Sequence, residues 1–188
     1  MRPKTIDLKF TNGRDHLKKG PNSCRNYGFE KSRGDIINWF DSDDLYQPHA
    51  LAEVVTHWQE GVDAVVVKVE RFNSETGKTV DYNTIQSNTL IEDYLTGKIT
   101  FYVCGPFWTR SFLEQQQDLF DPYIRNLDDW DFNLRMLYQK PHIVYLDQAL
   151  IRYRKFHWSL SKALVHHNDA EIRSAFYAER KTCGLIKS

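Results

Sequence analysis

Apolar residues are spaced along the chain in two patterns, and the two patterns alternate. Short apolar or β-branched runs predict strands at residues 6–10, 35–40, 64–69, 142–146 and 149–153. Apolar residues at helical spacing predict helices at residues 23–32, 48–60, 88–95, 128–138 and 169–182. The polar turn at residues 74–77 is expected to fold the 64–69 strand back as a hairpin, and Gly105-Pro106 is expected to end the apolar segment 101–104.

Regular alternation of strands and helices predicts an α/β fold. We expect a three-layer α/β/α sandwich in which helices cover both faces of a mostly parallel central sheet. The 188 residues suit one domain, with a sheet-and-helix core at residues 1–155 and a C-terminal loop and helix at residues 156–188.

Composition and charge narrow the class of protein. The chain is 41% hydrophobic and 14% aromatic, which indicates a folded globule with a substantial core. Its formal net charge is zero and no basic stripe is present, which argues against a nucleic-acid partner. No apolar run reaches the ~18 residues that a membrane-spanning helix needs. Cys24, Cys104 and Cys183 share no metal-type spacing, which favours a reduced, cytoplasmic protein.

The most informative polar segment follows the predicted strand at 35–40. Asp41, Asp43 and Asp44 would lie at the C-terminal tip of that strand, where open α/β sheets bind ligands. Several carboxylates this close repel one another unless a cation or ample water lies among them. Hard oxygen ligands suit Mg²⁺ or Mn²⁺, with substrate phosphates completing the coordination. The alternative is an ordinary Asp-rich turn that caps the helix after it.

A second acidic cluster, Asp128-Asp129-Trp130-Asp131, opens the predicted helix at 128–138. Carboxylates stabilise the first turn of any helix, so an ordinary helix N-terminus is one explanation. A carboxylate held there beside a cleft is also suited to act as a general base towards an attacking hydroxyl. Positive groups are found at Arg25, before the first acidic strand, and at Arg152, Arg154 and His157, where they suit a diphosphate.

The order of these motifs resembles that of family 2 glycosyltransferases with the GT-A fold. The resemblance begins with Gly20-Pro21-Asn22-Ser23-Cys24-Arg25-Asn26-Tyr27-Gly28, Gly34-Asp35-Ile36-Ile37 and Phe40-Asp41-Ser42-Asp43-Asp44. It continues with Leu119-Phe120-Asp121-Pro122, Asp128-Asp129-Trp130-Asp131-Phe132 and Tyr153-Arg154 followed by His157. It therefore covers residues 20 to about 162.

The resemblance implies a role for each matching residue. Asp41 and Asp43 match the Asp-X-Asp motif, which binds the donor and a Mn²⁺ or Mg²⁺ ion, and Asp129 matches the catalytic base. The donor-binding residues would be Arg25, Asn26, Asp41, Asp43, Arg154 and His157, and Asp128 and Trp130 would lie on the acceptor side. The family pair is Glu-Asp, and here Asp128 replaces the Glu.

The implied reaction is an inverting transfer of a sugar from a nucleotide sugar, in the first instance a UDP-sugar. The implied acceptor is a saccharide or lipid-linked saccharide used in polysaccharide biosynthesis. The expected location is the cytoplasm, with the inner face of the membrane as a peripheral site. Two other readings stay open: a non-catalytic or degenerate glycosyltransferase fragment, and a metal-dependent nucleotidyltransferase, for which the chain has no Gly-rich phosphate loop.

The chain also departs from the family. Members usually begin with a strand ending in a Pro-X-Tyr-Asn-like segment and a second strand ending in Val-Asp-Asp-Gly-Ser, and neither segment is found here. Residues 6–10 look like the third strand of the family. We therefore expect an N-terminally truncated domain with an uncovered strand edge.

Overall fold

The structure is a computed structural model that describes residues 20–155. Its helices are α1 (Pro21–Lys31), α2 (Ala50–Thr56), α3 (Leu90–Leu95), α4 (Arg110–Leu113) and α5 (Asp128–Tyr138). Its strands are β1 (Ile36–Ile37), β2 (Leu45–Tyr46), β3 (Ala64–Asn73), β4 (Thr79–Tyr82), β5 (Pro106–Thr109) and β6 (Ile143–Lys155). The expected strand at 6–10 and helix at 169–182 lie outside the described residues.

The strands form one mixed sheet in the order β1-β5-β3-β6-β2, and β4 pairs with β3 as the expected hairpin. Only β3 and β6 pair in parallel; the other pairings described are antiparallel. The expectation of a mostly parallel sheet is therefore wrong for residues 20–155. Strand and helix alternation does not reveal that β2 and β5 enter the sheet in the opposite direction to their neighbours.

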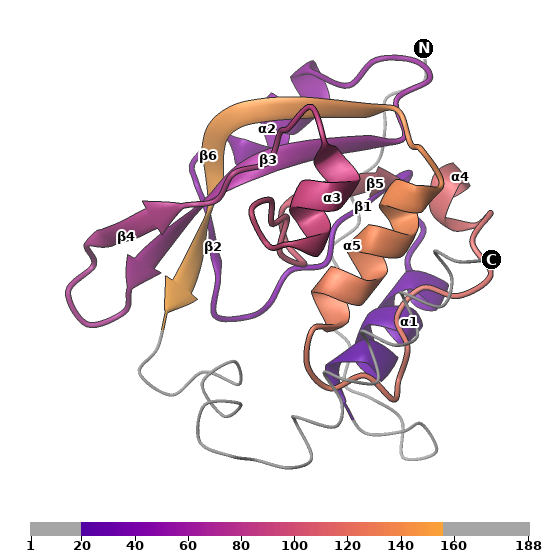
Figure 1. Cartoon of the computed structure of the whole chain (residues 1–188), viewed down its shortest axis with the longest axis horizontal. Coiled ribbons are helices and arrows are strands. Elements are labelled where there is room, and N and C mark those ends of the chain that lie inside the picture. Colours follow the sequence, from indigo (N-terminus) through magenta and orange to yellow (C-terminus); the bar gives the residue numbers. More distant parts are fainter. Residues whose placement is uncertain (1–19, 156–188) are drawn as a thin grey trace.

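Helices cover both faces of the sheet, as the three-layer prediction requires (Figure 1). The alternation of side chains along β3 shows this directly. Val65 and Val67 belong to a core cluster that contains Val54 of α2. Val66 belongs to a second cluster with Tyr94 of α3 and Leu134 of α5. The α/β class is therefore confirmed.

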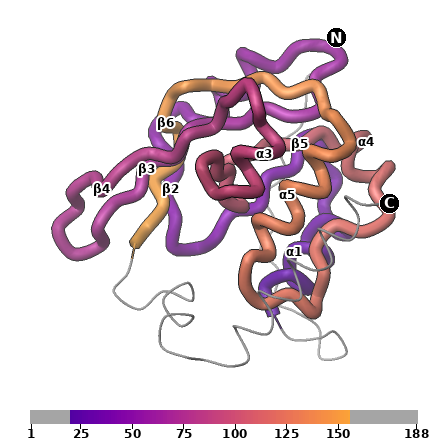
Figure 2. The backbone as a smooth tube through the Cα atoms, viewed as in Figure 1, coloured from indigo at the N-terminus to yellow at the C-terminus, as the bar shows by residue number. Residues whose placement is uncertain are grey.

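Two predicted elements change form in the structure. The predicted strands at 142–146 and 149–153 are one strand, β6, whose register with β3 shifts around Lys68. Figure 2 shows β6 bending along its path, as irregular pairing of this kind produces. The apolar segment 101–104 is not a strand, and β5 begins directly after Gly105, at Pro106. A Cβ atom at residue 105 would lie 2.2 Å from the carbonyl oxygen of Phe101. Only glycine fits this close approach.

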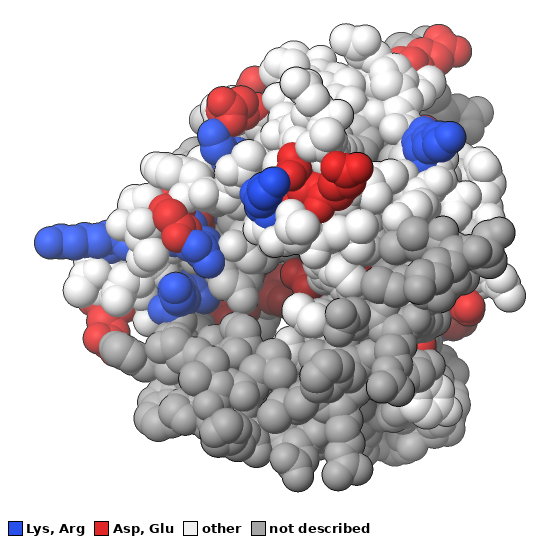
Figure 3. Space-filling model, viewed as in Figure 1, with Lys and Arg blue, Asp and Glu red and all other residues white. Residues whose placement is uncertain are grey.

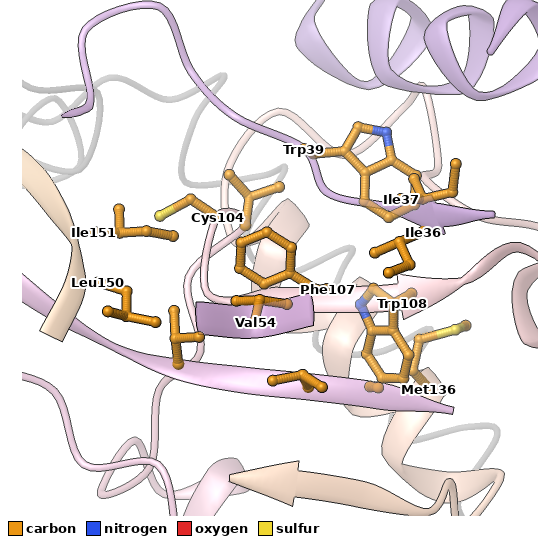
Figure 4. Packing of buried hydrophobic residues seen from close by; sticks show 14 of the residues in the cluster. Ile36, Ile37, Trp39, Val54, Cys104, Phe107, Trp108, Met136, Leu150 and Ile151 are labelled. Atoms are coloured by element: carbon orange, nitrogen blue, oxygen red, sulfur yellow. The ribbon is translucent and has the colours of Figure 1, made fainter. Parts of the chain in front are cut away.

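Aromatic packing fixes the segment that carries the first acidic motif. Figure 4 shows Trp39 beside Ile36 and Ile37, with Trp108 of β5 in the same core. The Trp39 ring meets Phe120 and Phe132 edge-on, with centroids 4.9 and 5.2 Å away. Its indole nitrogen donates to the Arg25 carbonyl oxygen at 3.1 Å. The residue two positions before Asp41 is thus held against both α1 and α5.

Candidate active site

Arg25 of α1 links the two acidic motifs. Its guanidinium donates to Asp41 Oδ1 at 3.3 Å through Nη2 and to Asp128 Oδ2 through Nη1, which also donates to Asn22 Oδ1 at 3.0 Å. The ring of Phe120 lies 5.3 Å from the guanidinium carbon. Burial opposes the charge of Arg25, but Asp128 and Asp41 outweigh that effect and raise its pKa. The structure therefore brings Arg25, Asp41 and Asp128 together.

The first acidic motif forms a tight turn. The Asp44 amide donates to the Asp41 carbonyl oxygen at 3.1 Å, and the turn leaves Asp43 exposed while Asp44 is buried. No hydrogen bond or ion pair joins the Asp43 carboxylate to another side chain of residues 20–155. The three carboxylates therefore differ in environment: Asp41 is paired with Arg25, Asp43 faces solvent and Asp44 points into the protein.

Arg154 ties this turn to the end of β6. Its Nε donates to the Asp43 carbonyl oxygen at 2.7 Å, and its backbone amide donates to Asp44 Oδ1 at 3.0 Å. Its guanidinium also lies over the Phe72 ring, 5.2 Å from the centroid. The predicted role of Arg154 in diphosphate binding stays a prediction, and His157 lies outside the described residues. In this structure Arg154 supports the turn that carries Asp43.

Two asparagines of α1 hold the loop that leads into α5. Asn26 donates to the Phe120 carbonyl oxygen at 2.7 Å and accepts from the Phe120 amide at 3.0 Å. Asn22 donates to the carbonyl oxygens of Asp121 and Ile124, both at 2.8 Å. These contacts set the position of α5 relative to α1. The side-chain amide of Asn26 is thus engaged by the protein backbone, and its predicted contact with a donor stays a prediction.

Asp129 lies in the first turn of α5, close to Asp128 and Arg25. Burial, followed by the charge of Asp128, raises the pKa of Asp129 to about 6, while Arg25 acts in the opposite direction. Its Oδ1 accepts from the Trp130 amide at 2.8 Å. Trp130 donates its indole N–H to the Tyr94 carbonyl oxygen at 3.3 Å and thereby packs the first turn of α5 against α3. A carboxylate with a pKa near 6 is ionised at neutral pH and basic enough to accept a proton.

The sequence motifs imply no separate role for Asp44, whose environment differs from that of Asp41 and Asp43. Burial, more than the neighbouring charges of Asp43 and Asp41, raises its pKa to about 7, against the opposing effect of the Arg154 amide. Its Oδ2 atom is buried and accepts no hydrogen bond of standard geometry. The fully buried Cys104 thiol lies near the Asp44 carboxyl group. A sequence of consecutive carboxylates gives no indication of which one turns inward.

The acidic residues of the candidate site fit one kind of divalent-cation site and not another. Between residues 20 and 155, no three His, Cys, Asp or Glu side chains converge in the way that an all-protein metal site needs. The exposed Asp43 fits the other kind of site, in which one or two carboxylates hold Mg²⁺ or Mn²⁺ and phosphate oxygens supply further ligands. A cation held by Asp43 would therefore need a phosphorylated substrate to complete its coordination.

A cleft opens beside the first acidic motif. It has a volume of about 390 Å³ and lies between α1 and the segment from Ile36 to Ser42, with Arg25 and Asp41 in its lining. Among residues 20–155, β1 lies at one end of the sheet order and pairs with β5. Figure 3 shows acidic side chains recessed in a hollow, with Lys and Arg side chains on the arm that β3, β4 and β6 form.

No helix in the described part of the chain is long and apolar enough to cross a membrane.

The fold and sequence were compared with known proteins. The putative glycosyltransferase EpsH of Bacillus subtilis (strain 168) is 24% identical over 144 residues, which are 72% of this chain and 42% of EpsH. The crystal structure of residues 1–349 of S. aureus TarS in complex with UDP-GlcNAc has a TM-score of 0.60 at 17% identity, over 78% of this chain and 42% of that one. The crystal structure of a mycobacterial protein has a TM-score of 0.53 at 15% identity, over 89% of this chain and 53% of that one.

The chain spans less than half of the length of EpsH and of the TarS structure. A sequence profile described as glycosyl transferase family 2 matches residues 14–116, more than half of the chain. That match includes α1 with Arg25 and the turn at Asp41–Asp44, whereas Asp129 lies beyond it. The chain belongs to glycosyl transferase family 2, and its fold is of the GT-A type.

Proposed function

We propose that this protein is an inverting glycosyltransferase that moves a sugar from a nucleotide-sugar donor to an acceptor hydroxyl. One observation carries the proposal: Arg25 holds the Asp41 turn and the Asp128-Asp129 pair in one site. A site for this reaction needs groups that bind an anionic leaving group close to a group that accepts a proton. The two acidic motifs supply these functions from different segments of the chain.

The donor side of the site is the turn at residues 41–44. Asp43, with Asp41 beside it, would hold a Mn²⁺ or Mg²⁺ ion together with the diphosphate. A divalent ion there supplies charge stabilisation to the leaving nucleoside diphosphate. Arg154 keeps the turn in place, and Arg25, Asn26 and His157 complete the proposed donor-binding set. The TarS complexes with UDP and UDP-GlcNAc, which share this fold, support UDP-sugars as the first donors to test.

The acceptor side is the first turn of α5. Asp129 takes the proton from the acceptor hydroxyl, whose oxygen then forms a bond to the anomeric carbon. The bond from that carbon to the diphosphate oxygen breaks on the opposite side, and the nucleoside diphosphate leaves with the electron pair. One such displacement inverts the anomeric configuration. Asp128 holds Arg25 beside the base, and Trp130 packs the acceptor side against α3.

The first prediction concerns Asp43. Replacing Asp43 with Ala should remove the Mn²⁺-dependent part of UDP binding, because the exposed carboxylate is the proposed metal ligand. Folding should change little, since substitutions of exposed surface groups usually alter the free energy of unfolding by less than about 0.5 kcal/mol. Calorimetric titration of UDP with and without Mn²⁺ measures the effect.

The matched control is Asp147→Ala, which removes an exposed carboxylate that pairs with Lys68 on the sheet. This control should bind UDP as the wild-type protein does. If Asp43→Ala keeps full Mn²⁺-dependent binding, Asp43 does not hold the metal.

The second prediction separates chemistry from donor binding. Asp129→Asn should lower kcat by the ~10²–10⁴-fold expected for loss of a general base, with UDP affinity nearly unchanged. Asp128→Asn should act differently, because Asp128 anchors Arg25 and through it the donor side. Turnover of a UDP-sugar and calorimetric UDP binding, measured on both variants, test this difference. A larger loss of kcat in Asp128→Asn than in Asp129→Asn would assign the base to Asp128.

The third prediction is the dependence of turnover on pH. Asp129 must be ionised to accept a proton, and its pKa is raised to about 6. The value of kcat/KM should therefore rise as pH increases through about 6 and level off above it. Asp44→Asn should keep this rise, because the Asp44 titration is not part of proton transfer. A profile that is flat between pH 5 and 7 would contradict Asp129 as the base.

A further inference from the structure

Tyr102 and Tyr153 form a stacked pair of aromatic rings. Their ring centroids are 5.1 Å apart and their planes differ by 16°. Tyr102 follows the buried Phe101, and Tyr153 lies near the end of β6. Both side chains are partly exposed, so the pair is not closed inside the core.

Backbone contacts connect the two rings to opposite sides of the site. The Tyr102 carbonyl oxygen accepts from Asn133 Nδ2 at 3.1 Å, and Asn133 lies four residues after Asp129 on the same face of α5. Tyr153 directly precedes Arg154, whose backbone amide donates to Asp44. One ring is therefore attached to the helix of the proposed base and the other to the turn of the proposed metal ligand.

The electrostatics of the two hydroxyls agree with this placement. Burial raises the pKa of Tyr153, and the charges of Asp44, Asp129 and Asp41 raise it further. Burial also raises the pKa of Tyr102; Arg71 acts in the opposite direction, and the charges of Asp81 and then Asp129 add to the rise. Both phenols therefore stay protonated and can donate hydrogen bonds beside the carboxylates.

The backbone of Tyr102 is in an unusual conformation. Its φ angle is 52°, in the left-handed region that bulky residues rarely adopt. Strain of this type persists where the surrounding structure fixes a side chain in a particular place. Here the fixed element is an aromatic ring that stacks on Tyr153.

We propose that the stacked Tyr102–Tyr153 pair is a platform for the pyranose ring that lies between Asp43 and Asp129 during transfer. This proposal rests on the proposed function and extends it to the sugar. A pyranose has a face of C–H groups that packs on an aromatic ring, while its hydroxyls remain available to polar groups at the edge. The two phenol hydroxyls and the nearby carboxylates provide such an edge.

The pyranose of the donor and that of the acceptor present the same kind of face, so two experiments separate them. The first uses methyl β-D-glucopyranoside alone and measures saturation transfer by NMR from protein aromatic protons to the sugar C–H protons. Wild-type protein and Tyr102→Phe should both show the transfer, because both keep the ring. Tyr102→Leu should reduce it at least about tenfold. Tyr82→Leu, at an exposed tyrosine of β4, is the matched control and should behave as the wild type.

The second experiment compares the affinities of UDP-GlcNAc and UDP by calorimetry with Mn²⁺. If the donor sugar occupies the platform, Tyr102→Leu weakens UDP-GlcNAc binding about tenfold and leaves UDP binding unchanged. If the acceptor sugar occupies it, both affinities are unchanged and only the methyl glucoside signal is lost. Unchanged behaviour in both experiments would overturn the platform.

Failure of the proposed function is distinguishable from failure of the platform. Wild-type protein that does not bind UDP with Mn²⁺ would refute the proposed function. The methyl glucoside experiment measures sugar binding to the tyrosine pair in the absence of nucleotide, so its result does not depend on that outcome. Tyr153→Leu, checked for folding by circular dichroism, gives the same comparison if Tyr102→Leu does not fold.

Discussion

One guanidinium group holds the candidate site together. Arg25 contacts Asp128, which is 103 residues away in the sequence, and Asp41, which is 16 residues away. A partly buried arginine with two carboxylate partners satisfies its charge by pairing, and removal of any partner leaves a charge uncompensated in a poorly solvated place. The same group lowers the pKa of Asp129 against the effect of burial. The relation between the two acidic motifs therefore depends on this residue.

The surrounding structure fixes the position of Arg25. Trp39 binds the Arg25 carbonyl oxygen and packs against Phe120 and Phe132, so the segment after β1 is held against α1 and α5. Asn22 and Asn26 hold the loop before α5 through backbone contacts. A buried aromatic group, the buried Asn22 amide and the half-buried Asn26 amide thus hold three segments in one arrangement. Precise placement of charged groups needs this kind of rigid support.

The sequence predicts parts of this arrangement and leaves others out. Helical spacing predicted a helix at residues 128–138, and α5 has those bounds. The prediction succeeds because the apolar side chains of this helix pack into both core clusters. Strand direction was predicted wrongly, since pairing partners are set by tertiary contacts that local patterns do not encode. The inward turn of Asp44 and the stacking of Tyr102 on Tyr153 were not predicted for the same reason. Neither residue type nor spacing indicates which carboxylate is buried or which rings meet.

The most direct test of the account measures the pKa of Asp129 with and without Arg25. Carboxyl ¹³C NMR titration of the wild-type protein, Arg25→Lys and Arg25→Met would give that value, with Asp129→Asn used to assign the signal. Because the Arg25 charge stabilises the ionised form, Arg25→Met should titrate at a higher pH than the wild type, and Arg25→Lys should lie closer to the wild type. An unchanged pKa of Asp129 in Arg25→Met would contradict the claim that Arg25 couples the two acidic motifs.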